Sequence, residues 1–306
     1  MKVAIIGRTE ILYETIELLR SNSHEIVCIL TAKEAPEYKR TALDFKNLAQ
    51  QLRIPFAMGS KISDFHEFLK AVNADISVSI NYSGIIPQSV IKLFPLGVLN
   101  AHGGDLPRYR GNACQAWAIL NGENRVGLCI HKMIGGELDS GDIIAREYLN
   151  IFDHTKITEV YKWMEGQIPE LFYKSIQELE KNPKYVLEKQ SKDSMDILRC
   201  YPRKPSDSKI IWSLSVTEVL RLINASNKPF SGAFCHYKHQ MLTIWDACKS
   251  NSSYKFCAVP GQITQLENDF MEVACGEGKI IIKNIEYLGE RIVPKKFFSS
   301  LRDRLN

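Results

Sequence analysis

An asparagine, a histidine and an aspartate stand where they could carry out acyl transfer to an amine. Asn100 and His102 follow an apolar run and lie two residues apart, so in an extended strand their side chains project to the same face. Asp139 comes thirty-seven residues after His102, between two strand-like runs, Gly127–Met133 and Asp142–Leu149. The amide can donate to a developing oxyanion and the imidazole can transfer a proton. The carboxylate can set the tautomer of the imidazole and raise its pKa.

The elements that must position these side chains alternate between strands and helices. Apolar runs predict strands at 2–7, 25–31, 54–57 and 76–80, and helical spacing predicts helices at 10–20, 43–52, 62–72, 112–120 and 156–179. Such alternation predicts an α/β fold with a doubly wound, mostly parallel sheet. Ligands bind such sheets at the carboxyl ends of the strands, which is where Asn100 and His102 stand.

The second part of the chain predicts a smaller β domain. Two prolines, at 202 and 205, mark a connection, and Ser215 with Glu218 forms a capping box that opens a helix over 216–225. Short strands are predicted at 233–237, 242–248, 261–266, 271–274 and 279–287. Five short strands separated by turn residues favour a small barrel. We place the domain boundaries at 1–190 and 203–306.

Composition excludes several classes of protein. The 306 residues are 45% hydrophobic and 24% charged, as in folded globular proteins. No apolar run reaches the roughly eighteen residues of a membrane span, and the first residues lack the pattern of a signal peptide. Eight scattered cysteines indicate reduced thiols and a cytoplasmic location. The first strand–helix turn has no GxGxxG, so a nicotinamide or flavin dinucleotide site is not expected.

Charge is divided unevenly along the chain. The net charge is +4, with −1 in the first 200 residues and +5 from residue 201 onward. This bias suits a phosphate-bearing ligand but falls short of a nucleic-acid footprint. His236 and His239 lie three residues apart beside Cys235, but a strand would point them to opposite faces, and no second pair of metal-binding residues lies nearby. We therefore expect no metal.

A set of motifs resembles the folate-dependent formyltransferase family. In chain order they are Asn-x-His at 100–102, Leu-Pro at 106–107, Tyr-Arg-Gly at 109–111, Trp-Ala-Ile-x-Asn-Gly-Glu at 117–123 and Leu-Asp-x-Gly-Asp at 138–142. The family includes methionyl-tRNA, glycinamide ribonucleotide and sugar-nucleotide formyltransferases. Two further motifs, Pro-Phe-Ser-Gly-Ala-Phe at 229–234 and Pro-Gly-Gln-Ile at 260–263, resemble the OB-like second domain of the tRNA and sugar enzymes. The family often has Ser-Leu-Leu-Pro after the histidine, where this chain has Gly104-Asp105-Leu106-Pro107.

The resemblance implies a Rossmann-like catalytic domain that uses 10-formyltetrahydrofolate as co-substrate. Asn100, His102 and Asp139 would be the catalytic residues, with Asn100 and His102 donating to the oxyanion. Two loops would hold the pterin, largely through backbone groups, and the predicted folate-binding residues are Tyr82, Ile85, Ile86, Leu106, Gly136, Glu137, Leu138 and Asp142. The acceptor substrate would contact Arg8, Asn81, Tyr109 and Arg110.

The loop at Ala32–Arg40 guides our prediction of the acceptor. In the tRNA enzymes this region is longer and more basic, because it enters the acceptor stem. Here it is short and nearly neutral, which favours a UDP-, dTDP- or GDP-linked amino-deoxy sugar over a tRNA. We therefore predict a nucleotide-sugar N-formyltransferase of lipopolysaccharide or O-antigen biosynthesis, and leave a homodimer open. The alternative is a methionyl-tRNA formyltransferase, and a more distant one is a non-catalytic nucleotide- or RNA-binding module on the same scaffold.

Overall fold

The chain divides into two compact units. The computed structural model describes residues 1–36, 38–252 and 255–306. Unit 1 comprises Met1–Gly111, Gly127–Leu149 and Lys162–Cys200, and unit 2 comprises Asn112–Val126, Asn150–Tyr161 and Tyr201–Asn306. The units thus interleave in sequence, whereas the boundaries predicted above, 1–190 and 203–306, divide the chain once. Those domain boundaries stay a prediction.

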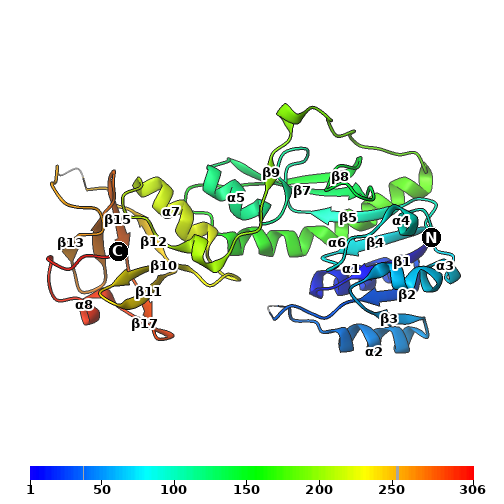
Figure 1. The fold of residues 1–306 in the computed structure, drawn as a ribbon, viewed down its shortest axis with the longest axis horizontal. Coiled ribbons are helices and arrows are strands. Elements are labelled where there is room, and N and C mark those ends of the chain that lie inside the picture. Colours follow the sequence, from blue (N-terminus) through cyan, green and yellow to red (C-terminus); the bar gives the residue numbers. More distant parts are fainter. Residues whose placement is uncertain (37, 253–254) are drawn as a thin grey trace. The chain divides into compact units, whose positions relative to one another are not determined.

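Unit 1 is built on a seven-stranded sheet in the order β3-β2-β1-β4-β5-β7-β8 (Figure 1). The strands are β1 (Lys2–Gly7), β2 (Glu25–Thr31), β3 (Phe56–Met58), β4 (Ile76–Ile80), β5 (Val98–His102), β7 (Arg125–Lys132) and β8 (Ile143–Asn150). Strands β1 to β5 pair in parallel, and β7 pairs antiparallel to β5. Asn100 lies opposite His131 in that antiparallel register. The Asn100 amide and the imidazole rings of His102 and His131 therefore lie at the same edge of the sheet.

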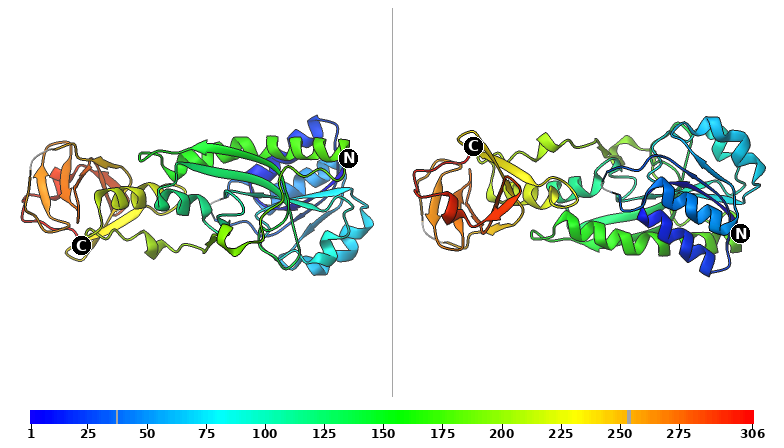
Figure 2. Two further views of the ribbon diagram at one scale, coloured as in Figure 1. Left: turned by 90° about the horizontal axis from the view of Figure 1, so that it is seen from above. Right: turned by 90° about the horizontal axis from the view of Figure 1, so that it is seen from below.

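Helices cover both faces of this sheet. Figure 2 shows α1 (Glu10–Ser21), α2 (Ala42–Leu52) and α6 (Ile157–Lys181) on one face, with α3 (His66–Ala71) and α4 (Gln88–Ile91) on the other. The apolar side chains of α1 recur at helical spacing and are buried against the sheet. The predicted helix over 62–72 begins instead as a 3₁₀ turn, Ile62–Phe65. The prediction of a doubly wound, mostly parallel sheet is confirmed.

Unit 2 contains α5 (Cys114–Asn121), α7 (Val216–Ala225) and α8 (Pro294–Phe297) together with two antiparallel sheets. The first sheet has β10 (Ala233–Tyr237), β11 (Gln240–Ile244), β16 (Ile285–Tyr287) and β17 (Glu290–Ile292). The second has β12 (Ala247–Lys249), β15 (Lys279–Ile282), β14 (Met271–Ala274) and β13 (Ile263–Leu266). The β character predicted for this part of the chain is confirmed.

Two predicted strands of unit 2 differ from the structure in one respect. The runs 242–248 and 279–287 each break near their middle, so each passes from one sheet to the other as β11–β12 and β15–β16. The apolar side chains between the two sheets share one core with α7. Helix α7 begins with the predicted capping box of Ser215 and Glu218.

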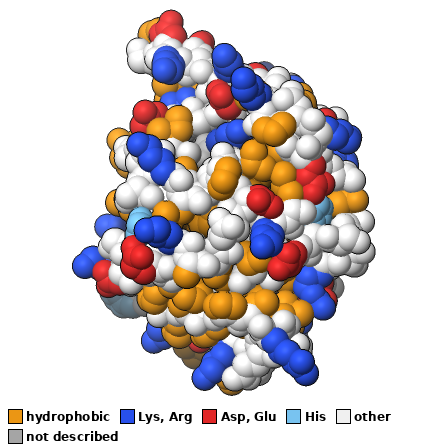
Figure 3. Space-filling model, turned by 90° about the vertical axis from the view of Figure 1, so that its right-hand side faces the viewer, with side chains coloured by type: hydrophobic (Ala, Val, Ile, Leu, Met, Phe, Trp, Pro, Cys, Tyr) orange, Lys and Arg blue, Asp and Glu red, His pale blue; other side chains and the backbone are white. Residues whose placement is uncertain are grey.

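Figure 3 shows a face on which Lys and Arg side chains are interspersed with Asp and Glu. Such mixing agrees with the net charge of −1 for the first 200 residues. Within the described ranges, no helix combines the length and the apolar character needed to span a bilayer.

Candidate active site

His102 is the centre of a buried hydrogen-bonded cluster. It ends β5 and is 7% exposed. Its Nδ1 lies 3.5 Å from Asp139 Oδ2, and its Nε2 lies 2.6 Å from the carbonyl oxygen of Tyr109. Because a carbonyl only accepts, Nε2 carries the proton and donates to it. The structure thus brings His102 and Asp139 together, as the sequence predicts.

Gly104 makes the close approach of the Tyr109 carbonyl possible. A Cβ built at Gly104 would lie 2.4 Å from that oxygen and 2.6 Å from His102 Nε2, far inside van der Waals contact. The chain departs from the usual family motif at this position, and the absence of a side chain lets the 103–111 loop fold over the imidazole.

Asn100 joins the cluster through a second histidine. Its Nδ2 lies 3.2 Å from His131 Nε2, and His131 Nδ1 lies 2.9 Å from the carbonyl oxygen of Lys132. Nδ1 therefore donates to the Lys132 carbonyl. In the neutral ring Nε2 accepts from the Asn100 amide, and in the protonated ring Nε2 donates to a carboxylate. The same Nε2 lies 3.5 Å from Asp139 Oδ1, so His131 stands between Asn100 and the carboxylate.

Burial decides the charge state of His102. Desolvation lowers the pKa of His102, and the Asp139 carboxylate raises it only in part. Asp139 acts in the predicted direction, but the net effect on the imidazole is the opposite of the expected rise. Burial would raise the pKa of Asp139, yet a hydrogen bond from His131 and the positive charge that His102 carries when protonated at acidic pH lower it to about 2. At neutral pH an ionised carboxylate therefore faces a neutral imidazole.

The Asp139 loop is fixed by contacts from distant residues. Asp139 has a φ of +47°, and its Oδ2 accepts from the backbone N–H of Gly111 at 2.9 Å. Gln190 donates to the carbonyl oxygens of Asp139 and Gly141, at 2.8 and 2.7 Å. The strand β6 (Arg110–Gly111) pairs in parallel with β9 (Arg199–Cys200), which keeps the donor N–H in place.

Two of the predicted acceptor-binding residues have partners within the chain. Arg110 donates through Nε and Nη2 to Gln190 Oε1, at 3.2 and 2.8 Å. The Tyr109 side chain is buried, and its carbonyl is the group that reaches His102. The roles predicted for these two residues in acceptor binding stay predictions.

Arg8 and Asn81, the other two, lie together at the carboxyl edge of the sheet. Arg8 Nε donates to the Asn81 carbonyl at 2.8 Å and Nη1 to the Lys33 carbonyl at 2.7 Å. The guanidinium also lies 5.3 Å from the centre of the Tyr38 ring. Arg8 thus connects three loops at the edge where β1, β2 and β4 end.

The two loops predicted to hold the pterin are adjacent. Gly135 N donates to Gln88 Oε1 at 2.8 Å, which joins the 134–142 loop to the start of α4. Ile85 and Leu138 expose 85% and 43% of their surface on these loops, as a flat apolar ring would require. A Cβ at Gly136 would meet no atom within 4 Å. These residues fit a bound folate.

Two other predicted folate residues serve the core. Ile86 packs in the cluster beneath α3 and α4, and Leu106 packs against Cys129 and Ile143. Their side chains therefore support the loops, and the prediction that these two residues bind the folate stays a prediction. The phenol of Tyr82 donates to the Gly59 carbonyl at 2.6 Å. Glu137 accepts from Ser140 at 2.6 Å, and the Asp142 carbonyl accepts from Lys132 N.

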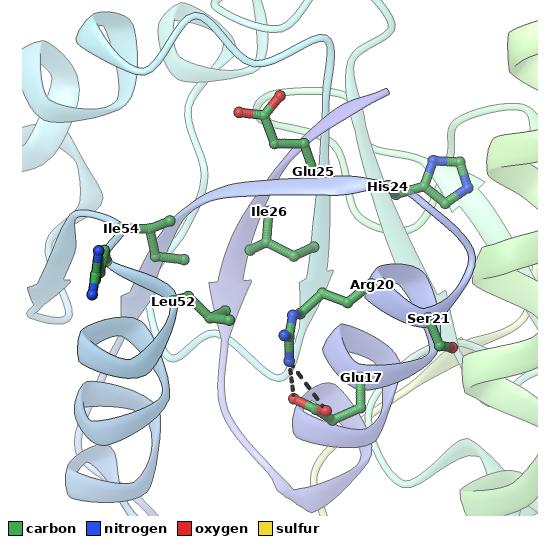
Figure 4. Close-up of a pocket in the computed structure, with 9 residues that line it drawn as sticks. Glu17, Arg20, Ser21, His24, Glu25, Ile26, Leu52 and Ile54 are labelled. Carbon is green, nitrogen blue, oxygen red and sulfur yellow. Dashed lines mark hydrogen bonds and ion pairs between the residues drawn. The ribbon is translucent and has the colours of Figure 1, made fainter.

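A separate cavity of about 600 Å³ lies at the opposite edge of the sheet (Figure 4). It is lined by α1, by the start of β2 and by the end of α2, and Arg20 forms an ion pair with Glu17 there at 3.0 Å. None of the catalytic candidates lines it. In the described ranges no group of three or more His, Cys, Asp or Glu side chains is arranged to hold a metal ion.

Comparison with known proteins agrees with this geometry. The sequence profile of the family described as formyl transferase matches residues 1–176, and the profile of its C-terminal domain matches residues 203–302. The chain belongs to the formyl transferase family. It is accordingly a folate-dependent N-formyltransferase, and 10-formyltetrahydrofolate is its co-substrate. The distant alternative, a binding module without chemistry, is thereby set aside.

Relatives of this formyltransferase correct the predicted acceptor. The methionyl-tRNA formyltransferase of Acetivibrio thermocellus is 27% identical over 95% of this chain and 93% of its own length. That of Malacoplasma penetrans is 26% identical over 94% and 90%. The prediction of a nucleotide-sugar enzyme is therefore wrong, and the tRNA alternative agrees better with these relatives.

A solved structure confirms the fold of this formyltransferase. The N-formyltransferase from Helicobacter canadensis, in complex with folinic acid and dTDP-3-aminofucose, has a TM-score of 0.68. It is 19% identical and covers 92% of this chain and 99% of its own. Because the sequence identity is this low, the match supports a shared fold and nothing more.

Residues that sequence reasoning did not place in the site complete it. Gln190 sits in a charged stretch with no motif around it, so no local signal points to it. His131 could have been found from strand pairing, because its position opposite Asn100 follows from the antiparallel register. Gly104 carried a signal, since it differs from the family motif.

Proposed function

We propose that this formyltransferase formylates the α-amino group of methionyl-tRNA. The observation that carries the proposal is the similarity to methionyl-tRNA formyltransferases along nearly the whole chain, both domains included.

Two carboxylates, one inside and one outside the loop at 32–40, accept hydrogen bonds from backbone N–H groups in and next to the loop. Glu34 accepts from Ala42 N at 3.1 Å, at the start of α2. Glu10 of α1 accepts from Lys39 N at 3.2 Å. These contacts fix the backbone of the loop beside the starts of α1 and α2.

The catalytic residues divide the work of formyl transfer. When bound, 10-formyltetrahydrofolate supplies the formyl carbon to which the amine forms its new C–N bond while the bond to the folate nitrogen breaks. Asn100 Nδ2 and His102 Nε2 donate to the negative charge that develops on the formyl oxygen. To do so, His102 exchanges its bond to the Tyr109 carbonyl for one to substrate.

Asp139 supports the proton transfer. The amine loses a proton when it attacks, and the folate nitrogen needs one to leave. The neutral imidazole of His102 can take up the proton of the amine at Nδ1, where the ionised Asp139 carboxylate lies 3.5 Å away and stabilises the imidazolium. The imidazolium can then give this proton to the folate nitrogen as the bond from that nitrogen to the formyl carbon breaks.

A formylation assay tests the acceptor. The purified protein is incubated with 10-formyltetrahydrofolate and methionine-charged initiator tRNA, and formylmethionine is measured by mass spectrometry. We expect formylation that falls steeply with rising salt and is about 10²–10³ times slower in Asn100→Ala. Uncharged tRNA and tRNA charged with N-acetylmethionine, which lacks the free amine, should remain unchanged. Formylation of amino-sugar nucleotides with no reaction on methionyl-tRNA would refute the proposal.

We further propose that the reaction takes place in the cytoplasm. The eight cysteines are scattered along the sequence with no C-x-x-C pair, which supports a reducing compartment.

A further inference from the structure

Gln190 is the most completely bonded side chain near the site. Its Nε2 donates to the carbonyl oxygens of Asp139 and Gly141, and its Oε1 accepts twice from Arg110. A primary amide has two N–H donors and two acceptor lone pairs, so its whole capacity is used. The side chain is 8% exposed, and water cannot readily replace these partners.

Gln190 bonds to a backbone segment that has an unfavourable conformation at Asp139. Asp139 adopts a φ of +47°, in the left-handed region that residues other than glycine rarely occupy. Its carboxylate is held by Gly111 N, and its carbonyl is held by Gln190. With its carboxylate and its backbone carbonyl both held, Asp139 keeps its carboxylate next to His102 and His131.

A neighbouring residue holds the other catalytic loop. Glu188 Oε2 lies 2.9 Å from Arg146 Nη2, which also donates to the Leu106 carbonyl at 2.8 Å. Backbone bonds between Glu188 and Ile143 keep this segment alongside β8. Residues 187–191 therefore tie together the loop that covers His102 and the loop that carries Asp139.

We propose that Gln190 is a positioning residue for formyl transfer, which acts by holding Asp139 opposite His102. It touches neither of the two catalytic side chains, so its effect passes through the backbone of the Asp139 loop. The proposal depends on the formyltransferase activity and is independent of which amine accepts the formyl group.

The first readout is how well ordered the Asp139 loop is, measured by hydrogen exchange of its backbone amides in the protein without substrates. In Gln190→Ala we expect faster exchange of the amides in 135–142, with unchanged exchange in unit 2. Gln190→Met keeps the length of the side chain without its hydrogen bonds and should behave alike, which covers the case that the alanine variant folds poorly. The matched control is Gln50→Ala, on the exposed face of α2. Unchanged exchange of 135–142 in both Gln190 variants would overturn the proposal.

A double-mutant cycle with Asp139→Asn is the second readout. Misplacing a catalytic group by about 1 Å can cost about a hundredfold in rate, so Gln190→Met should lower kcat by about ten- to a hundredfold. In the Asp139→Asn background the same substitution should have almost no further effect, because the group that it positions has already lost its function.

An additive result in that cycle, with equal losses in both backgrounds, would show that Gln190 serves only stability. The acceptor in these assays is the one that wild type formylates. If methionyl-tRNA proves not to be that acceptor, the failure appears in wild type, and the hydrogen-exchange result still decides the role of Gln190.

Discussion

Replacing Asp139 with asparagine removes a negative charge from the histidine cluster while preserving the size of the side chain. Burial would raise the pKa of Asp139, but a hydrogen bond from His131 and the positive charge that His102 carries when protonated at acidic pH lower it from 3.8 to about 2. A change of this size corresponds to about 2 kcal/mol of native-state stability.

The sign of the effect follows from the direction of the change. The folded pKa lies below that of the unfolded chain, so the stabilisation is fully present above about pH 4 and is lost as the pH falls toward 2. About 1 kcal/mol should disappear between pH 5 and pH 3. The D139N protein has no carboxylate to protonate here, and its stability should lack this part of the acid dependence.

Guanidinium unfolding at pH 7, 5, 4 and 3, followed by tryptophan fluorescence, measures this difference. The gap in unfolding free energy between wild type and D139N should narrow by about 1 kcal/mol from pH 5 to pH 3. The control is Gln50→Ala, on the exposed face of α2, which removes no titratable group, so its gap to wild type should stay constant. A constant gap for D139N as well would refute the electrostatic reasoning.

The same variant reports on catalysis at pH 7. Without the carboxylate, the imidazolium of His102 loses its stabilising partner, and turnover should fall by about 10²–10⁴. Turnover near that of wild type in a folded D139N protein would mean that Asp139 has no part in the proton transfer.

Three further predictions concern residues around the site and in unit 2. His131→Leu should leave the Asn100 amide without its acceptor and lower kcat by about tenfold; an unchanged kcat at the same folded fraction would contradict this role. Gly104→Ala places a methyl group 2.4 Å from the Tyr109 carbonyl, so the loop must shift; a crystal structure of the variant should show that carbonyl displaced, and an unmoved loop would be the contrary result. Ser215→Ala removes the N-cap of α7 and should destabilise unit 2 by about 1 kcal/mol, as measured by thermal unfolding, with kcat unchanged.

The local pattern of residue types was sufficient to predict most of the fold. The capping box at Ser215, the burial of α1 along one face and the first four parallel strands depend on residues within a few positions of one another. Such features are set by spacing and side-chain type, and they appear in the structure close to where the sequence predicts them. The catalytic motif is of the same kind, since Asn100 and His102 share a face because they alternate along one strand.

The sequence by itself therefore determined the fold class, the family and the pairing of His102 with Asp139. Only the tertiary structure decided the charge state of His102, because desolvation depends on what covers the ring and outweighs the nearby carboxylate. Only the tertiary structure also showed that Gln190 donates to the Asp139 carbonyl. Gln190 lies fifty-one positions downstream, in a stretch without a motif. Contacts over such distances depend on how distant segments pack together, and no local pattern of residue types records that packing.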